Sequence, residues 1–290
     1  QGKDGRQEQY TFAELKRRSS QFANFLKSRG VSQGDRVSGL LPRTPELIIT
    51  ILATWRIGAV YQPLFTAFGP KAIEHRLQLA QSKLVVTDVG NRDKLHDVEG
   101  CPAIVTVTGA KGTGLYQGDY SFWAEVNRQS DQCELEMMNI QDPFLLMFTS
   151  GTTGPAKPLQ VPLKALIAFG GYMQDAIGLR AEDSFWNIAD PGWAYGLYYG
   201  ITGPLLLGHP TIFYEGAFTP DSLCQIVQDY GVNNLAGAPT AYRMMMAADP
   251  QQMAKLHGKF RVVSSAGEPL NPEVFRWFKQ VLDAPIFDHY

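Results

Sequence analysis

Hydroxyl and glycine residues crowd one short stretch of the chain, and a single lysine, Lys157, follows them. The hydroxyl groups and the flexible backbone belong to six residues: Thr149, Ser150, Gly151, Thr152, Thr153 and Gly154. Hydroxyl donors, closely approaching backbone N–H groups and one mobile cation together suit a polyphosphate. Because the apolar run "FLLMF" at residues 144–148 reads as a buried strand, the pattern predicts a phosphate-binding loop at a strand end.

Two other interpretations of this loop stay open from the residues alone. The phosphate loop of nucleotide hydrolases needs Gly before its Lys and Ser or Thr after it, whereas this chain has Ala156 and Pro158. Short stretches of Ser, Thr and Gly are also common as plain connections between a strand and a helix. The preceding strand, the density of hydroxyls and the lysine favour the functional interpretation.

The wording "FTSGTTGPAK" is similar to the signature loop of the AMP-forming acyl-CoA synthetases, a superfamily shared with peptide-synthetase adenylation domains and luciferases. The resemblance implies that residues 149–154 and Lys157 hold the ATP phosphates, with Thr152 and Lys157 as the catalytic pair. The family loop usually continues with Gly after the Lys, so Pro158 is a departure.

Two later segments resemble the family's nucleotide-binding motifs. "SAGEPLNPEVFRWF", residues 265–278, resembles the segment that wraps adenine, which implies that role for Gly267, Glu268 and Pro269. "FDHY" resembles the start of the aromatic-Gly-Gln-Thr-Glu motif, which implies contacts with AMP from Asp288, His289 and Tyr290. Taken alone, "GEP" is more often a turn before a helix that begins at Asn271 and Pro272.

Two further segments resemble the family's substrate-binding regions. "PGWAYG" is similar to the acyl-pocket segment, with four candidate residues: Trp193, Ala194, Tyr195 and Gly196. "GAPTAYR" resembles the segment near the pantetheine tunnel of CoA, with three: Ala238, Pro239 and Thr240. Isolated aromatic residues are more often core or surface residues, so the order of the motifs carries the assignment.

Strand and helix patterns alternate along the chain. A capping box at Thr11 and Glu14 predicts a helix to about residue 28. The remaining predicted helices lie at residues 45–57 and 163–177 and begin near 219 and 271, and the predicted strands are "DRVSGLLP", "LVVTD", "AIVTV", "FLLMF", "TIFY" and "RVVSS". This alternation predicts an α/β fold with two lobes of mostly parallel sheet flanked by helices. The loop-like stretch 109–118 suggests a first lobe over 1–115 and a second over 116–290.

Composition and charge exclude several classes of protein. The net charge of -2 gives no basic footprint for nucleic acid. The longest apolar stretch, "LIITILATW", is too short to span a membrane and reads as a buried helix. The three cysteines and five histidines lack the spacing of a disulfide framework or a zinc site. We therefore expect a cytoplasmic protein with small-molecule ligands, no membrane insertion and no metal site of its own.

The resemblance implies a two-step reaction: a carboxylate attacks the α-phosphorus of ATP, pyrophosphate leaves, and CoA then captures the acyl adenylate. The implied substrates are ATP with Mg²⁺, CoA, and acetate or another short- to medium-chain acid. The chain stops before the family's Mg²⁺-binding Glu, ribose-binding Asp and C-terminal Lys, so we expect these 290 residues alone to be inactive. The alternatives are an enzyme that loads a carrier protein, a nucleotide hydrolase or kinase, and a non-catalytic ATP-binding module.

Overall fold

The computed structural model describes residues 1–109, 112–149 and 155–289, and it divides the chain into two compact units. The first unit is Glu8–Ala165, and the second combines Gln1–Gln7 with Leu166–Tyr290. The boundary expected at residues 115 and 116 falls inside the first unit, because the strands that follow it complete the sheet of that unit.

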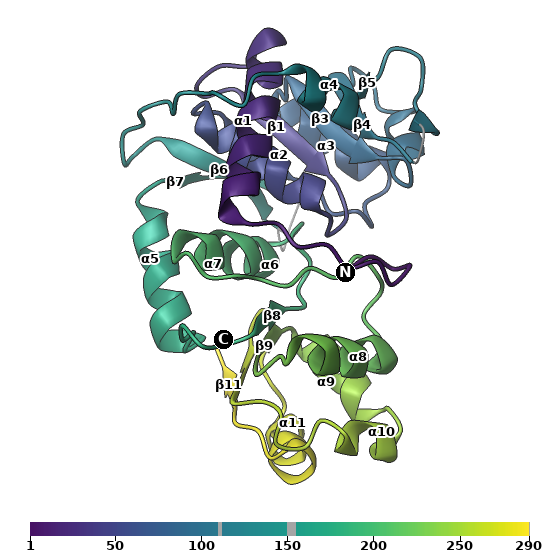
Figure 1. The fold of residues 1–290 in the computed structure, drawn as a ribbon, viewed down its shortest axis with the longest axis vertical. Helices are drawn as coiled ribbons and strands as arrows, with labels where there is room; N and C mark the ends of the chain where they lie inside the picture. The colour runs from purple at the N-terminus through teal and green to yellow at the C-terminus, as the bar shows by residue number, and fades with distance from the viewer. Residues whose placement is uncertain (110–111, 150–154, 290) are drawn as a thin grey trace. The chain divides into compact units, whose positions relative to one another are not determined.

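A seven-stranded sheet forms the middle of the first unit (Figure 1), with the strand order β5-β4-β3-β1-β2-β6-β7. The bounds are β1 (Arg36–Leu40), β2 (Val60–Pro63), β3 (Leu84–Asp88), β4 (Ala103–Val107), β5 (Tyr120–Ser121), β6 (Pro143–Thr149) and β7 (Lys157–Pro162). All neighbouring strands are parallel except β6 and β7, which are antiparallel. Buried β-branched residues fill β3, which begins and ends at the predicted residues, as does β4.

Helices cover both faces of this sheet. They are α1 (Phe12–Ser28), α2 (Pro45–Arg56), α3 (Pro70–Ala80), the 3₁₀ turn η1 (Arg92–Leu95) and α4 (Phe122–Arg128). The predicted capping box is present, since the Thr11 side chain accepts from the Glu14 backbone and Glu14 accepts in return. The rings of Phe22 and Phe122 pack α1 against α4 with centroids 4.6 Å apart. The predicted buried helix is α2, and α3 contributes Ile73 and Leu77 to a separate cluster.

The second unit contains a four-stranded, fully parallel sheet with the order β11-β10-β9-β8. The strands are β8 (Phe185–Asn187), β9 (Asn234–Gly237), β10 (Val262–Ser265) and β11 (Ile286–Asp288). The helices are α5 (Ala165–Gly171), α6 (Ala194–Leu197), α7 (Gly203–Leu206), α8 (Pro220–Tyr230), α9 (Pro239–Met246), α10 (Pro250–Ala254) and α11 (Pro272–Trp277), with π turns η3 (Tyr172–Ala176), η4 (Tyr198–Thr202) and η5 (Phe278–Leu282). The predicted α/β class with two mostly parallel sheets is confirmed.

One predicted strand is wrong. Residues 211–214, "TIFY", form no strand of either sheet. The segment instead bonds to the start of the chain, because the Gln1 amino group donates to Phe213 O at 2.6 Å and Glu215 N donates to Gln1 O at 3.0 Å. Its apolar side chains, Ile212 and Tyr214, pack against the core of the second unit, which explains the strand-like pattern.

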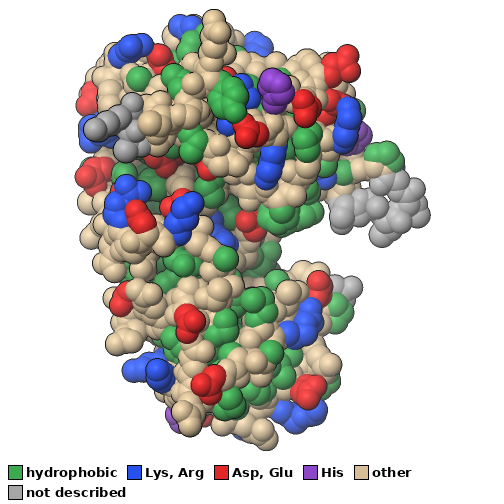
Figure 2. Space-filling view, turned by 90° about the vertical axis from the view of Figure 1, so that its right-hand side faces the viewer, with side chains coloured by type: hydrophobic (Ala, Val, Ile, Leu, Met, Phe, Trp, Pro, Cys, Tyr) green, Lys and Arg blue, Asp and Glu red, His purple; other side chains and the backbone are tan. Residues whose placement is uncertain are grey.

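No helix in the described part of the chain is long and apolar enough to cross a membrane. The three cysteines are free thiols, and burial raises the pKa of Cys101 to about 11. Figure 2 shows Lys and Arg side chains interspersed with Asp and Glu on the face that it presents. This mixture agrees with the small net charge of the sequence.

Candidate functional site

A β-hairpin carries the candidate phosphate loop in the first unit. Thr149 ends β6 and Lys157 begins β7, and the two residues are direct partners in the antiparallel register. Both are exposed, and Lys157 has no acidic partner among the described residues. Ser150, Gly151, Thr152, Thr153 and Gly154 lie outside the described residues. The plain interpretation of a strand-to-helix connection is wrong, since the loop is followed by a second strand.

Two consecutive residues of α3 contact the base of this hairpin. The His75 Nε2 atom lies 3.0 Å from the carbonyl oxygen of Ala156, the residue just before Lys157. The guanidinium of Arg76 lies over the ring of Phe148, 5.5 Å from its centroid, on the opposite strand. The desolvation of half-buried Arg76 lowers its pKa. One helix therefore holds both strands where the loop leaves the sheet.

The carboxyl ends of all four parallel strands carry the other candidate segments. The acyl segment follows β8, the CoA segment follows β9, the adenine segment follows β10, and Asp288 ends β11. The registers Asn187↔Ala236, Ser265↔Gly237 and Ser265↔Asp288 bring these ends together at one edge of the sheet. Ligands of open α/β sheets bind at this edge, where strand ends and loops converge.

The acyl segment is folded back on its own strand. Asn187 of β8 accepts from Ala189 N at 2.9 Å and donates to Tyr195 O at 3.2 Å, so one amide holds both ends of the loop. The Asp190 carboxylate accepts from Gly192 N at 2.7 Å. Gly196 lies so close to the Asp190 backbone that an added Cβ would be 2.2 Å from its carbonyl oxygen. Glycine is therefore required at position 196.

Aromatic side chains from three segments gather beside the acyl segment. The rings of Tyr172 and Tyr199 stack at 4.0 Å, and Tyr195 meets Tyr199 edge-on at 5.6 Å. The Tyr172 hydroxyl and His289 Nδ1 are 2.8 Å apart. Burial raises the pKa of Tyr195 and of Tyr172 well above the usual range, so both phenols stay neutral. The buried Tyr195 hydroxyl has no hydrogen-bond partner among the described residues. Desolvation lowers the pKa of His289, partly offset by the nearby Asp288 carboxylate.

The adenine segment and the end of β11 are linked by two hydrogen bonds, one accepted by a side chain and one between backbone groups. The Asp288 carboxylate accepts from Leu270 N at 2.9 Å, and His289 N donates to Ser265 O at 2.8 Å. Gly267 has a φ of +97°, a conformation that favours glycine, and Glu268 and Pro269 are exposed beside it. Tyr290 lies outside the described residues.

Arg243 joins the CoA segment to the adenine segment. Ala238 is the N-cap of α9, Pro239 is its first residue, and Thr240 is exposed. The Arg243 guanidinium donates to Thr240 Oγ1 at 3.1 Å and to the Glu268 carboxylate at 3.2 Å. The ion pair is half exposed, so its contribution to stability is small.

Sequence reasoning missed four residues of this arrangement: His75, Tyr172, Asn187 and Arg243. Tyr172 lies 117 positions from its partner His289, and His75 lies 81 from Ala156. Asn187 and Arg243 have local partners, because Asn187 accepts from the backbone N–H two residues later and Arg243 follows Thr240 by one helical turn.

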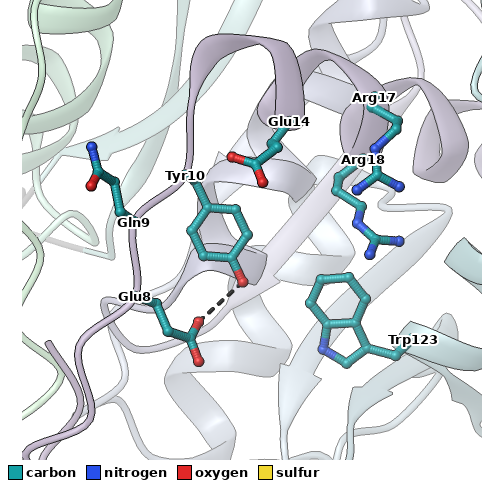
Figure 3. Close-up of a pocket in the computed structure, with 7 residues that line it drawn as sticks. All are labelled: Glu8, Gln9, Tyr10, Glu14, Arg17, Arg18 and Trp123. Atoms are coloured by element: carbon teal, nitrogen blue, oxygen red, sulfur yellow. Dashed lines mark hydrogen bonds between the residues drawn. The ribbon is translucent and has the colours of Figure 1, made fainter.

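A separate cavity of about 390 Å³ opens near the start of α1 (Figure 3) and contains none of the predicted site residues. Several of its polar groups already have partners. Glu14 caps α1, the Tyr10 hydroxyl donates to Glu8 at 3.0 Å, and Arg18 lies over the Trp123 ring and donates to Asn127. Its mixed charges favour no anionic ligand.

Comparison with known proteins gives matches along nearly the whole chain. The AMP-binding enzyme family matches residues 3–290. The acetyl-coenzyme A synthetase of Bacillus subtilis is 38% identical over 290 residues, which cover 98% of this chain and 50% of that protein. The corresponding enzyme of Deinococcus radiodurans is 36% identical over 313 residues, covering 97% and 47%. The chain thus spans about half the length of the curated relatives it matches.

Solved structures agree with this result. The crystal structure of the Brucella canis acyl-CoA synthetase matches with a TM-score of 0.96 and 56% identity, covering 99% of this chain and 52% of that one. An anthranilate CoA ligase in complex with anthranoyl-AMP has a TM-score of 0.90 at 20% identity, a likeness of fold alone.

Proposed function

The chain belongs to the family of AMP-binding enzymes. From this membership we propose that it is part of an AMP-forming acyl-CoA ligase. The reaction would join a carboxylic acid to AMP with release of pyrophosphate, and then transfer the acyl group to the thiol of CoA. The observation that carries the proposal is the gathering of the acyl, CoA and nucleotide segments at the carboxyl ends of one parallel sheet.

Each part of the substrates has a proposed set of residues. Residues 149–154 and Lys157 would hold the phosphates, with Thr152 and Lys157 as catalytic residues. Gly267, Glu268 and Pro269 would contact adenine, together with Asp288, His289 and Tyr290. The acyl chain would contact Trp193, Ala194, Tyr195 and Gly196, and CoA would pass Ala238, Pro239 and Thr240.

The main task of the protein in this reaction is to align the carboxylate with the α-phosphorus of ATP. A carboxylate is an adequate nucleophile and pyrophosphate an adequate leaving group, but both reactants are anions that repel each other. An exposed lysine without an acidic partner can offset charge on the departing phosphates, because its full positive charge is available to the ligand. The neutral phenols near the acyl segment would exclude water without adding negative charge.

Magnesium would enter as the counter-ion of ATP. The described residues contain no group of three or more His, Cys, Asp or Glu side chains that could hold a metal ion. Such a group is not needed for Mg²⁺ that arrives with ATP, because one or two carboxylates and the substrate phosphates usually hold this ion.

The acid is proposed to be acetate or another short- to medium-chain carboxylate. The similarity to acetyl-coenzyme A synthetases supports the short end of this range. The cluster of Tyr172, Tyr195 and Tyr199 beside the acyl segment supports apolar recognition. One methylene changes discrimination by only about 1–3 kcal/mol in an apolar pocket, so a panel of acids is needed.

Two alternatives lie close to this proposal. A relative that loads a carrier protein would adenylate its acid but release no AMP in response to CoA. A non-catalytic ATP-binding module would bind ATP without any reaction. The exposed Lys157 and the linked strand ends support a catalytic role over the second alternative.

The test is the exchange of labelled pyrophosphate into ATP by the natural full-length protein, with acetate, propionate, butyrate, octanoate and benzoate offered in turn. We expect exchange that requires an acid, and AMP release that then requires CoA. Exchange without CoA-dependent AMP release would support carrier loading. Binding of ATP without exchange for any of the acids would contradict the ligase.

A further inference from the structure

The contact between His75 and Ala156 links α3 to the hairpin of the phosphate loop. The two atoms, His75 Nε2 and the Ala156 carbonyl oxygen, are 3.0 Å apart. A carbonyl oxygen can only accept, so Nε2 must carry a hydrogen, in the neutral Nε2–H tautomer or the imidazolium. The bond therefore persists whether the ring is neutral or charged.

The histidine projects from a helix that is itself fixed to the sheet. The buried Gln62 of β2 donates its side-chain amide to the Arg76 carbonyl at 3.2 Å. Ile73 and Leu77 are fully or almost fully buried in the adjacent cluster. The imidazole is thus held by a rigid element, and its bond to Ala156 transfers that rigidity to the start of β7.

The start of β7 is paired with another strand on one side only. It is an edge strand whose one neighbour in the described sheet is β6. Pro155 and Pro158 flank Ala156 and Lys157, and proline has no backbone N–H to donate. Residues 157–160 are exposed. The side-chain bond to the Ala156 carbonyl therefore adds a second restraint to the pairing of Lys157 with Thr149, at the point where the strand begins.

We propose that His75 is a positioning residue. Its hydrogen bond to the Ala156 carbonyl orients Lys157 towards the phosphates of ATP. This inference rests on the proposed function of Lys157 as a phosphate ligand. In this proposal His75 does not touch ATP. It acts by setting the direction of the backbone at Ala156, the residue before Lys157. The neighbouring Arg76 acts on the other strand of the hairpin, through the Phe148 ring.

The kinetic test compares three variants of the full-length protein in the exchange assay. His75→Leu keeps bulk but cannot donate, and we expect the KM for ATP to rise by up to about tenfold. That limit is reached if the whole free energy of the lost hydrogen bond is needed to order Lys157. His75→Gln keeps a donor on Nε2, and we expect a KM for ATP near that of the parent. His96→Ala removes an exposed histidine of the same unit and should change neither the KM for ATP nor the KM for the acid. The KM for the acid should stay constant throughout.

A purely structural role for His75 gives a different pattern. The proposal is overturned if His75→Leu leaves the KM for ATP unchanged, if it raises the KM values for ATP and acid alike, or if His75→Gln is as impaired as His75→Leu.

A second measurement does not depend on activity. Hydrogen–deuterium exchange of the peptide over Lys157–Pro162 should be faster in His75→Leu than in the parent and His75→Gln, with β1 unchanged. If His75→Leu speeds deuterium uptake but the parent shows no acid-dependent exchange of pyrophosphate into ATP, the proposed function is contradicted. The structural role of the His75–Ala156 contact is then still supported. Activity with unchanged KM and unchanged uptake would contradict the positioning role alone.

Discussion

The base of the β6–β7 hairpin and the carboxyl edge of the four-stranded sheet hold their functional candidates in different ways. The hairpin presents Lys157 on an exposed edge strand that is restrained by β6 and by two side chains of α3. At the strand ends of the second unit, candidate residues are bonded to neighbouring segments, as Asp288 is to Leu270 N and Tyr195 O is to the Asn187 side chain.

Function and stability should separate at the hairpin and remain coupled at the strand ends. A side chain without partners contributes little to folding, so its removal should affect chemistry alone. A residue that ties neighbouring segments together supports both the fold and the substrate site. Substitutions at the two places should therefore change activity and stability in different proportions.

Replacing Lys157 with Ala should remove most of the activity and almost none of the stability. The substitution deletes the cation that offsets phosphate charge, and we expect the rate of pyrophosphate exchange to fall by about 100-fold or more. Thermal unfolding should be unchanged, because the described structure gives the side chain no ionic partner. Lys164→Ala, at another exposed lysine of the same unit, is the control. An equal loss of exchange activity in Lys157→Ala and Lys164→Ala would contradict a specific role of Lys157.

Replacing Gly196 with Ala should damage stability and acid binding together. The new Cβ would meet the Asp190 carbonyl oxygen at 2.2 Å, so the acyl loop must shift at a cost of about 1–3 kcal/mol in the free energy of unfolding. The KM for the acid should rise with it. Gly171→Ala is the matched control, since no atom lies within 4 Å of its added Cβ and its φ is helical. Similar unfolding midpoints for the two variants would contradict this prediction, because they would show that the acyl loop can shift without loss of stability.

The pH dependence of stability should reveal the burial of His289. Because burial lowers its folded pKa, the unfolded chain binds a proton first as pH falls below about 6.5, the ordinary imidazole value. Stability contributed by neutral His289 is therefore present above pH 6.5 and lost as pH falls towards the lower folded pKa. We expect the midpoint of thermal unfolding to fall less between pH 7 and 5 in His289→Gln than in the parent. His257→Gln, at an exposed histidine, should behave like the parent.

The elements that sequence predicted best are those whose signals are local. The capping box of Thr11 and Glu14 is formed within one turn, and buried β-branched runs define β3. Strand β7 was missed because "KPLQVP" contains two prolines, which are compatible with an edge strand but not with a central one. The "TIFY" strand failed because its backbone bonds to Gln1 at the far end of the sequence.

The candidate site divides in the same way. The motifs located strand ends, because a strand followed by a glycine-rich or proline-started segment is visible in the sequence. The partners of these residues were not visible. His75 reaches Ala156, and Tyr172 reaches His289, only after helices pack on the sheets, so no spacing rule encodes either contact.

Arg243→Ala should have the smallest effect at the strand ends. It breaks the link between Thr240 and Glu268, but the ion pair is about half exposed, so the free energy of unfolding should change by less than about 1 kcal/mol. Arg261→Ala is the instructive comparison, because Arg261 pairs with the fully buried Asp183 carboxylate and its loss should cost about 3–5 kcal/mol. Chemical denaturation of both variants measures the difference. If Arg243→Ala destabilised as much as Arg261→Ala, the side-chain bridge would hold the strand ends together. A small loss for Arg243 would assign that role to the backbone bonds of Leu270 and His289.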